Sequence, residues 1–211
     1  TVGISGTTEI RMSGSNSGAD TLLVEAAGFL LGVGQVNFTG TIVYAGGTDG
    51  NDKIELDDTI SAGVPPHATV YGSVVYAFDA ATDSGTIFID TGGVGPGDRF
   101  AIRYSGLDDT APDAILQTLN VLALTLDYSN ADPRVGVTFT DSGTSQQQTD
   151  ATRNAGSATN VRFLNPDASL TVLGSAGNDT FSFDSFGTDG SGNTFHAALV
   201  VDAGGGSPDT V

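Results

Sequence analysis

The sequence predicts an all-β chain: a parallel β-helix, or β-solenoid, with an irregular insertion in its middle. Apolar and polar residues alternate on both sides of glycine-rich turns, most clearly in Ile42–Leu56 and Leu170–Phe183, and such alternation is typical of β-strands. The chain contains 30 Gly among 211 residues, and its abundant Gly, Asp, Ser and Thr favour turns and strands over helices. Strand–turn–strand units ending their turns in Asp recur about every 30 residues, a period that suits stacked solenoid coils.

Residues 1–106 are predicted to form the first solenoid coils. Strands are expected at 41–45 and 53–57, with Ile42, Ile54 and Leu56 on the inward face. Because one coil cannot bury its inward face alone, each coil is expected to stack on a neighbour. Looser alternation predicts further strands around residues 74–78, 87–89 and 100–104.

Residues 107–165 interrupt the repeat. The segment 110–119 has a capping Thr, an early Pro and an early Asp, which predict a helix of about two turns. Alternating apolar residues at 122–128 and 135–139 predict two strands, and the polar stretch 141–160 predicts a long loop. Val161 and Phe163 are expected to re-enter a sheet.

Residues 166–211 are predicted to return to solenoid coils. Strands are expected at 170–173 and 180–183, with Val172, Phe181 and Phe183 facing inward. The last residues stop where other repeats begin their outgoing strand, and the chain begins at Thr1 without Met. We therefore expect a processed product or a piece of a longer protein.

The composition excludes several classes of partner and scaffold. A formal net charge of -18 repels nucleic acid and anionic membranes and attracts cations. The absence of Cys excludes a disulfide framework. No apolar run is long enough to span a membrane.

At its Gly-Asn-Asp turns the chain resembles the calcium-binding glycine- and aspartate-rich repeats of secreted RTX-type bacterial proteins. Gly174–Phe181 (GSAGNDTF) matches most closely, and Gly204–Val211 (GGGSPDTV) and Gly46–Ile54 (GGTDGNDKI) match with small changes. The resemblance implies calcium bound by turn carbonyls and Asp carboxylates. The implied metal ligands are Asp52, Asp179, Asp209, Asp20 and Asp49.

Two departures qualify this resemblance. The family repeats in tandem, whereas here single copies recur about every 30 residues, a spacing more similar to the β-helical repeats of very large bacterial surface proteins. In addition, Asp113–Phe139 looks like the end of the cadherin-like, immunoglobulin-type modules of such adhesins. That likeness implies a small sandwich over about 70–165 as the alternative to a plain insertion.

Calcium suits this chemistry because it takes six to eight hard oxygen ligands, which Asp and turn carbonyls supply. The alternative is that Gly-Asn-Asp only satisfies turn geometry, since Asn and Asp cap their own backbone. Both readings of the turns stay open on the sequence alone.

No catalytic residues are predicted: there is no thiol, and His67 and His196 lie near no recognisable Ser or Asp motif. We expect a noncatalytic extracellular or cell-surface segment that is structural or adhesive and is stabilised by Ca2+. The expected partners are further repeats or identical chains, paired end to end through strands, and a surface polysaccharide. The alternative is a polysaccharide-lyase-like enzyme on a β-helix, with Arg99, Arg103, Arg134 or Arg162 as base.

Overall fold

The computed structural model describes most of the chain. The described residues are 9–15, 18–25, 40–47, 52–57, 70–80, 83–90, 99–107, 114–131, 134–144, 146–155, 159–188, 195–206 and 208–211. Within these ranges the chain forms 15 strands and no helix, which confirms the predicted all-β class. It follows that no described helix is long and apolar enough to cross a membrane.

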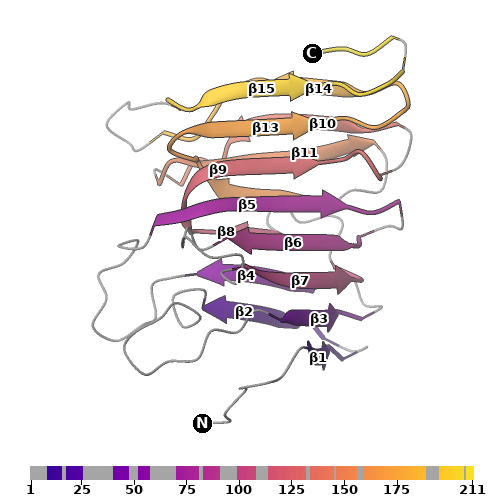
Figure 1. Cartoon of the computed structure of the whole chain (residues 1–211), viewed down its shortest axis with the longest axis vertical. Coiled ribbons are helices and arrows are strands. Elements are labelled where there is room, and N and C mark those ends of the chain that lie inside the picture. The colour runs from indigo at the N-terminus through magenta and orange to yellow at the C-terminus, as the bar shows by residue number, and fades with distance from the viewer. Residues whose placement is uncertain are drawn as a thin grey trace.

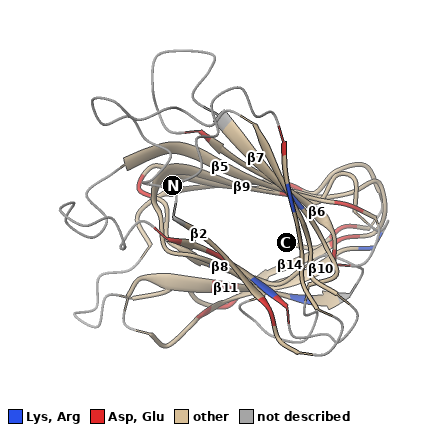
Figure 2. Cartoon of the chain, turned by 90° about the horizontal axis from the view of Figure 1, so that it is seen from below, with Lys and Arg blue, Asp and Glu red and all other residues tan. Residues whose placement is uncertain are grey.

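The strands form two mixed sheets, and within each sheet they follow one another along the long axis of the molecule (Figure 1). Sheet A contains, in spatial order, β1 (Glu9–Ser13), β3 (Thr41–Ala45), β7 (Arg99–Ser105), β6 (Gly85–Asp90), β5 (Val70–Phe78), β9 (Asn120–Asp127), β13 (Ser169–Leu173) and β15 (Ala198–Asp202). Sheet B contains β14 (Thr180–Phe183), β10 (Gly136–Asp141), β11 (Gln148–Ala155), β12 (Val161–Leu164), β8 (Ile115–Gln117), β4 (Lys53–Asp57) and β2 (Thr21–Glu25). Viewed along the stack, the two sheets face each other across the interior (Figure 2).

Successive repeats pair in parallel and in register. In sheet A, Ile10 of β1 lies beside Ile42 of β3, and in sheet B, Leu22 of β2 lies beside Ile54 of β4. The strands predicted at 41–45, 53–57, 170–173 and 180–183 are all present, as β3, β4, β13 and β14. The chain crosses from sheet A to sheet B after β1, β3, β7, β9 and β13, so these crossings set the position of the turns discussed below.

Each sheet also contains one antiparallel meander. Strands β5, β6 and β7 form it in sheet A, and β10, β11 and β12 form it in sheet B. The outer strands of each meander pair in parallel with the strands of neighbouring repeats. The meanders are thus part of the same two sheets as the repeats.

The core lies between the sheets and is lined by the inward-facing positions. Ile42, Ile54, Leu56, Val172 and Phe181 are all buried as predicted, and Phe183 packs against this core while partly buried. All five Tyr of the chain are also buried there. Stacked aromatic pairs cross between strands, such as Phe78 with Tyr128 at 4.5 Å between ring centroids.

Two predictions for the middle segment are wrong. Where a helix was expected, Ile115–Gln117 forms β8, which pairs with β4 on one side and β12 on the other. Tertiary pairing overrides the local helix signals because Ile115 fills an inward position of sheet B. Where a long loop was expected, Gln148–Ala155 forms β11.

The polar sequence of β11 is compatible with a central strand because its side chains are hydrogen-bonded. The Thr149 hydroxyl is buried and donates to Asn165 Oδ1 at 2.6 Å, and it accepts from the Gly187 N–H at 2.9 Å. On the other face, Arg162 of β12 forms a two-point ion pair with Asp150 at 2.6 and 2.9 Å. A buried polar group with its bonds satisfied does not require an apolar residue.

Candidate functional site at the aspartate turns

The predicted metal-binding residues lie along one edge of the molecule, where the chain passes from sheet A to sheet B. We call this edge the turn edge; it is marked by the described residues on either side of each turn that the sequence predicts, namely Gly14 and Asp20, Gly46 and Asp52, Ser129 and Val135, Gly174 and Asp179, and Ala203 and Asp209. The sheets stack successive turns on one another because their strands pair in register. Asp49 falls outside the described residues.

The Asp179 carboxylate closes its own turn. Oδ2 accepts the Ser175 N–H at 2.6 Å, and the Ser175 hydroxyl lies 3.0 Å from each carboxylate oxygen. The same arrangement occurs at the other end of the chain, where Asp20 Oδ2 accepts from the N–H and the hydroxyl of Ser15. The carboxylate therefore replaces the backbone partners that a tight turn leaves unpaired.

The carboxylates also link neighbouring turns in two sets, Asp20 with Asp52 and Asp179 with Asp209, which together we call the aspartate ladder. The Asp20 N–H donates to Asp52 Oδ1 at 2.9 Å, and the Asp179 N–H donates to Asp209 Oδ1 at 3.0 Å. The Val135 N–H donates to Asp179 Oδ1 at 2.8 Å, so the ladder continues through a position that is not Asp. Each bond joins a backbone amide to the carboxylate of the next turn toward β15.

Glycine at the start of three of these turns, Gly14, Gly46 and Gly174, permits this close stacking. A Cβ on Gly174 would collide with the Ala203 carbonyl and approach Asp179 Oδ2, and a Cβ on Gly46 would collide with the Gly106 carbonyl and approach Asp52. The absence of a side chain thus lets the carboxylate and the neighbouring backbone share one small volume.

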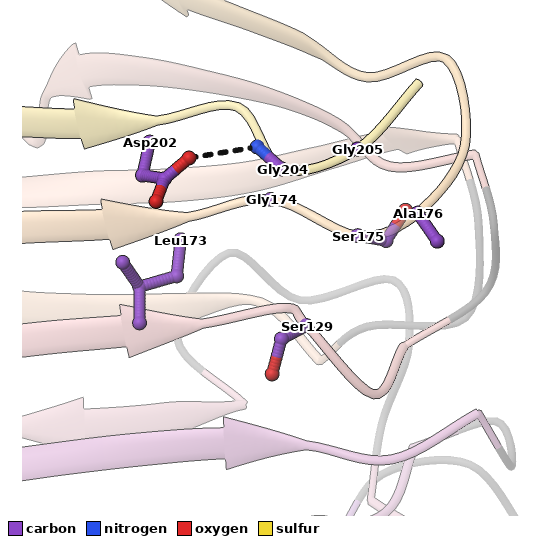
Figure 3. A pocket seen from close by; sticks show the side chains of 8 residues that line it. All are labelled: Ser129, Leu173, Gly174, Ser175, Ala176, Asp202, Gly204 and Gly205. Carbon is purple, nitrogen blue, oxygen red and sulfur yellow. Dashed lines mark hydrogen bonds between the residues drawn. The ribbon is translucent and has the colours of Figure 1, made fainter.

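A shallow pocket of about 350 Å³ opens on the turn edge (Figure 3). Backbone and small side chains line it, and one carboxylate, Asp202, accepts the Gly204 N–H at 3.1 Å beside it. The lining residues are Ser129, Leu173, Gly174, Ser175, Ala176, Asp202, Gly204 and Gly205. The pocket therefore places a single acidic group, Asp202, beside mostly small residues on the turn edge.

The hydrogen bonds of the ladder limit which of its carboxylate oxygens calcium could use. Asp52 and Asp179 are fully buried, and the Asp179 oxygens already receive N–H and O–H donors. Donors directed at a carboxylate occupy the lone pairs that a cation would use. Within the described ranges, no group of three or more His, Cys, Asp or Glu converges on one point. The ladder members that are not fully buried are at its two ends, Asp20 and Asp209, which are half-buried.

The arginines considered as catalytic bases do not converge in the described structure. Arg103 lies on β7 in sheet A, Arg162 on β12 in sheet B and Arg134 in the turn before β10. The side chain of Arg99 is not described.

A different acidic, basic and aromatic group lies between the sheets. Asp83, at the tip of the β5–β6 hairpin, lies 3.8 Å from Arg153 of β11, and their side chains are only 12% and 14% exposed. Burial raises the pKa of nearby Tyr104, and the negative charges of Asp79 and Asp83 raise it further, while the neighbouring Thr159 side chain opposes the shift. Sequence reasoning missed this group because Asp83 and Arg153 lie far apart in the chain, in two different hairpins. Its residues become neighbours only when both hairpins are in place.

No family model, curated protein or solved structure matched this chain. Arguments about function therefore depend on the geometry of the chain itself.

Proposed function

We propose that this chain is a noncatalytic structural or adhesive segment of an extracellular bacterial surface protein, built as a β-solenoid and stabilised by calcium. The observation that carries the proposal is the register of the repeats: their strands pair in parallel, and with one antiparallel meander in each sheet they continue sheet A from β1 to β15 and sheet B from β2 to β14. A stack of this kind gives length and rigidity without a catalytic cleft, because each unit mainly supports its neighbours.

The charge distribution supports a role for cations. The chain has 25 acidic residues against 7 basic ones, and stacking turns brings carboxylates of successive units close together. Calcium at the exposed oxygens of the turn edge reduces this repulsion. The half-buried ends of the ladder and the pocket beside Asp202 supply the accessible oxygens.

The calcium part is tested by thermal unfolding in calcium and in chelator. Binding to the native state alone stabilises it by mass action, by about 2.7 kcal/mol at a hundredfold excess over the dissociation constant. We expect a higher midpoint in calcium, and magnesium at the same ionic strength is the control for simple screening. An unchanged midpoint would mean that the aspartate turns are ordinary turns.

The structural role is tested by sedimentation of the unmodified chain over a range of concentrations. We expect species larger than the 21.3 kDa monomer, promoted by calcium. A monomer at every concentration, with or without calcium, contradicts self-assembly as its role.

A further inference from the structure

The two outer strands of sheet A expose side chains that equivalent strands bury. Leu199 of β15 is 41% exposed, whereas its register partner Leu170 on β13 is fully buried. At the other end, Met12 of β1 is 48% exposed, whereas its partner Tyr44 on β3 is 4% exposed. Among the described strands, β15 pairs only with β13 and β1 pairs only with β3. Among the described residues, both edges therefore present inward-facing apolar side chains and backbone groups that pair with no further strand.

The backbone groups on these edges have matching polarity. The Ala198 N–H donates to β13, so alternate residues of β15, including Leu199 and Val201, direct their N–H and C=O groups to the free edge. The Gly14 N–H donates to β3, so Glu9 and Arg11 of β1 direct theirs to the other free edge. Suppose that β15 pairs in parallel with β1 of another copy and Leu199 lies beside Ile10. The N–H and C=O groups of Leu199 then face those of Glu9 and Arg11, as parallel pairing requires.

The aspartate ladder has complementary ends. In the described part of the chain, no donor reaches Asp20 Oδ1 and no acceptor receives the Asp209 N–H. Since each ladder bond runs from an amide to the next Oδ1 toward β15, Asp209 ends as a donor and Asp20 begins as an acceptor. The interior members Asp52 and Asp179 are fully buried, whereas these two end members are half-buried.

Equal turn lengths are compatible with one register for this junction. Asp209 follows Ala203 by six positions, as Asp20 follows Gly14 and Asp52 follows Gly46. Placing Gly14 of a second copy beside Ala203 puts Ile10 beside Leu199 and Arg11 beside Val200, by the same register that aligns Leu170 with Leu199. It also places Asp20 of that copy beside Asp209.

We infer that a second copy of this chain adds head to tail, with its β1 pairing in parallel with β15 and its Asp20 Oδ1 accepting the Asp209 N–H. This inference rests on the proposed structural function and specifies the surface that it uses. The contact joins two different surfaces, so it repeats without closing and produces a filament.

The register is tested by cross-linking, because the chain contains no Cys and single thiols are unambiguous. One preparation carries Arg11→Cys and the other Val200→Cys; the Arg11 side chain is 74% exposed and Val200 is 50% exposed. A short bifunctional thiol reagent is added to the mixture in calcium-containing buffer. We expect a cross-linked dimer in the mixture of the two variants. We expect no dimer when either variant is treated with the reagent alone.

The matched control replaces Val200→Cys with Phe88→Cys, which lies on the same outer face of sheet A but in its middle and is 46% exposed. Equal cross-linking with Phe88→Cys, or dimers from either variant alone, would overturn the head-to-tail register. Absence of any dimer would overturn it as well.

A second measurement separates this inference from the proposed function. Leu199→Lys places a charge on the inward side of β15, and Val200→Lys places the same charge on its outward side. We expect loss of association in sedimentation for the first and retention for the second. If the unmodified chain associates and both variants still do so, the junction is wrong while self-assembly stands. If the unmodified chain stays monomeric, self-assembly itself fails.

Discussion

At the residue scale, the important groups are single carboxylates that serve two turns at once. Asp179 accepts from Ser175 within its own turn and from Val135 in the turn of the preceding repeat. The side chain thus holds the turn closed and fixes the distance to its neighbour. Because the group is fully buried, its donors have no water to replace it.

We predict that Asp179→Ala strongly destabilises the fold. The substitution leaves the Val135 and Ser175 N–H groups without their acceptor, at about 1–3 kcal/mol for each buried donor. Asp209→Ala removes one ladder bond from a half-buried position and should cost about 1 kcal/mol. Urea unfolding of the two variants measures the difference, and equal losses would contradict the dual role of Asp179.

The sequence locates these residues but does not reveal what they contact. Gly-Asn-Asp between alternating runs identifies Asp52 and Asp179 as turn residues. The partner Val135 carries no such signal, because its turn starts after Tyr128 and ends without Asp. Only the register of β10 beside β14 brings Val135 to Asp179.

At the element scale, the two meanders are held together across the interior. Asp83 adopts a positive φ of 54° at the tip of the β5–β6 hairpin and faces Arg153 of β11 in the opposite sheet. The pair therefore connects the meander of sheet A with the meander of sheet B. Low exposure strengthens the attraction but also makes the loss of either partner costly.

We predict that Asp83→Asn and Arg153→Met each destabilise the chain by about 3 kcal/mol, because each leaves the opposite charge buried without this partner. The double variant should cost clearly less than the sum, as expected for residues in contact. A double-mutant cycle from urea unfolding provides the measurement. Strict additivity would mean that the two side chains act independently.

Element prediction succeeded where alternation alone decides the outcome and failed where pairing decides it. Strands such as β3 and β14 have apolar residues at every second position, so their inward faces are evident. In contrast, β11 reads Gln-Thr-Asp-Ala-Thr-Arg-Asn-Ala, and its strand state depends on β10 and β12 on either side. No local pattern indicates that neighbouring strands will satisfy those polar groups.

At the scale of the whole molecule, the interior contains polar side chains, phenols above all, among its apolar residues. All five Tyr are buried between the sheets, and Thr149, Gln117 and Asn165 are buried as well. Gln117, the last residue of β8, forms two hydrogen bonds through its side chain. Its amide N–H donates to the Leu119 carbonyl at 2.8 Å, and its amide oxygen accepts the Leu164 N–H at 2.9 Å. The core therefore depends on the neutral form of its phenols as well as on apolar packing.

This dependence predicts alkaline unfolding. Burial raises the pKa of Tyr76, and the nearby Tyr104 adds to the shift; burial also raises the pKa of Tyr128 above its ordinary value. A group whose pKa is raised in the folded state contributes full stability below the unfolded pKa of about 10 and loses it as pH rises toward the folded value. Stability should thus be level below pH 10 with respect to these groups and fall above it.

The expected decline is about 1.4 kcal/mol per pH unit for each buried Tyr that ionises only on unfolding. Urea midpoints measured between pH 8 and about pH 11, with phenolate absorbance recorded in parallel, give the slope and the number of Tyr released. Tyr76→Phe should reduce the slope by the contribution of one Tyr, about 1.4 kcal/mol per pH unit, because it removes a fully buried phenol and keeps the ring. Phenolate absorbance that appears before unfolding, or a slope unaffected by Tyr76→Phe, would show that the phenols titrate in the folded chain.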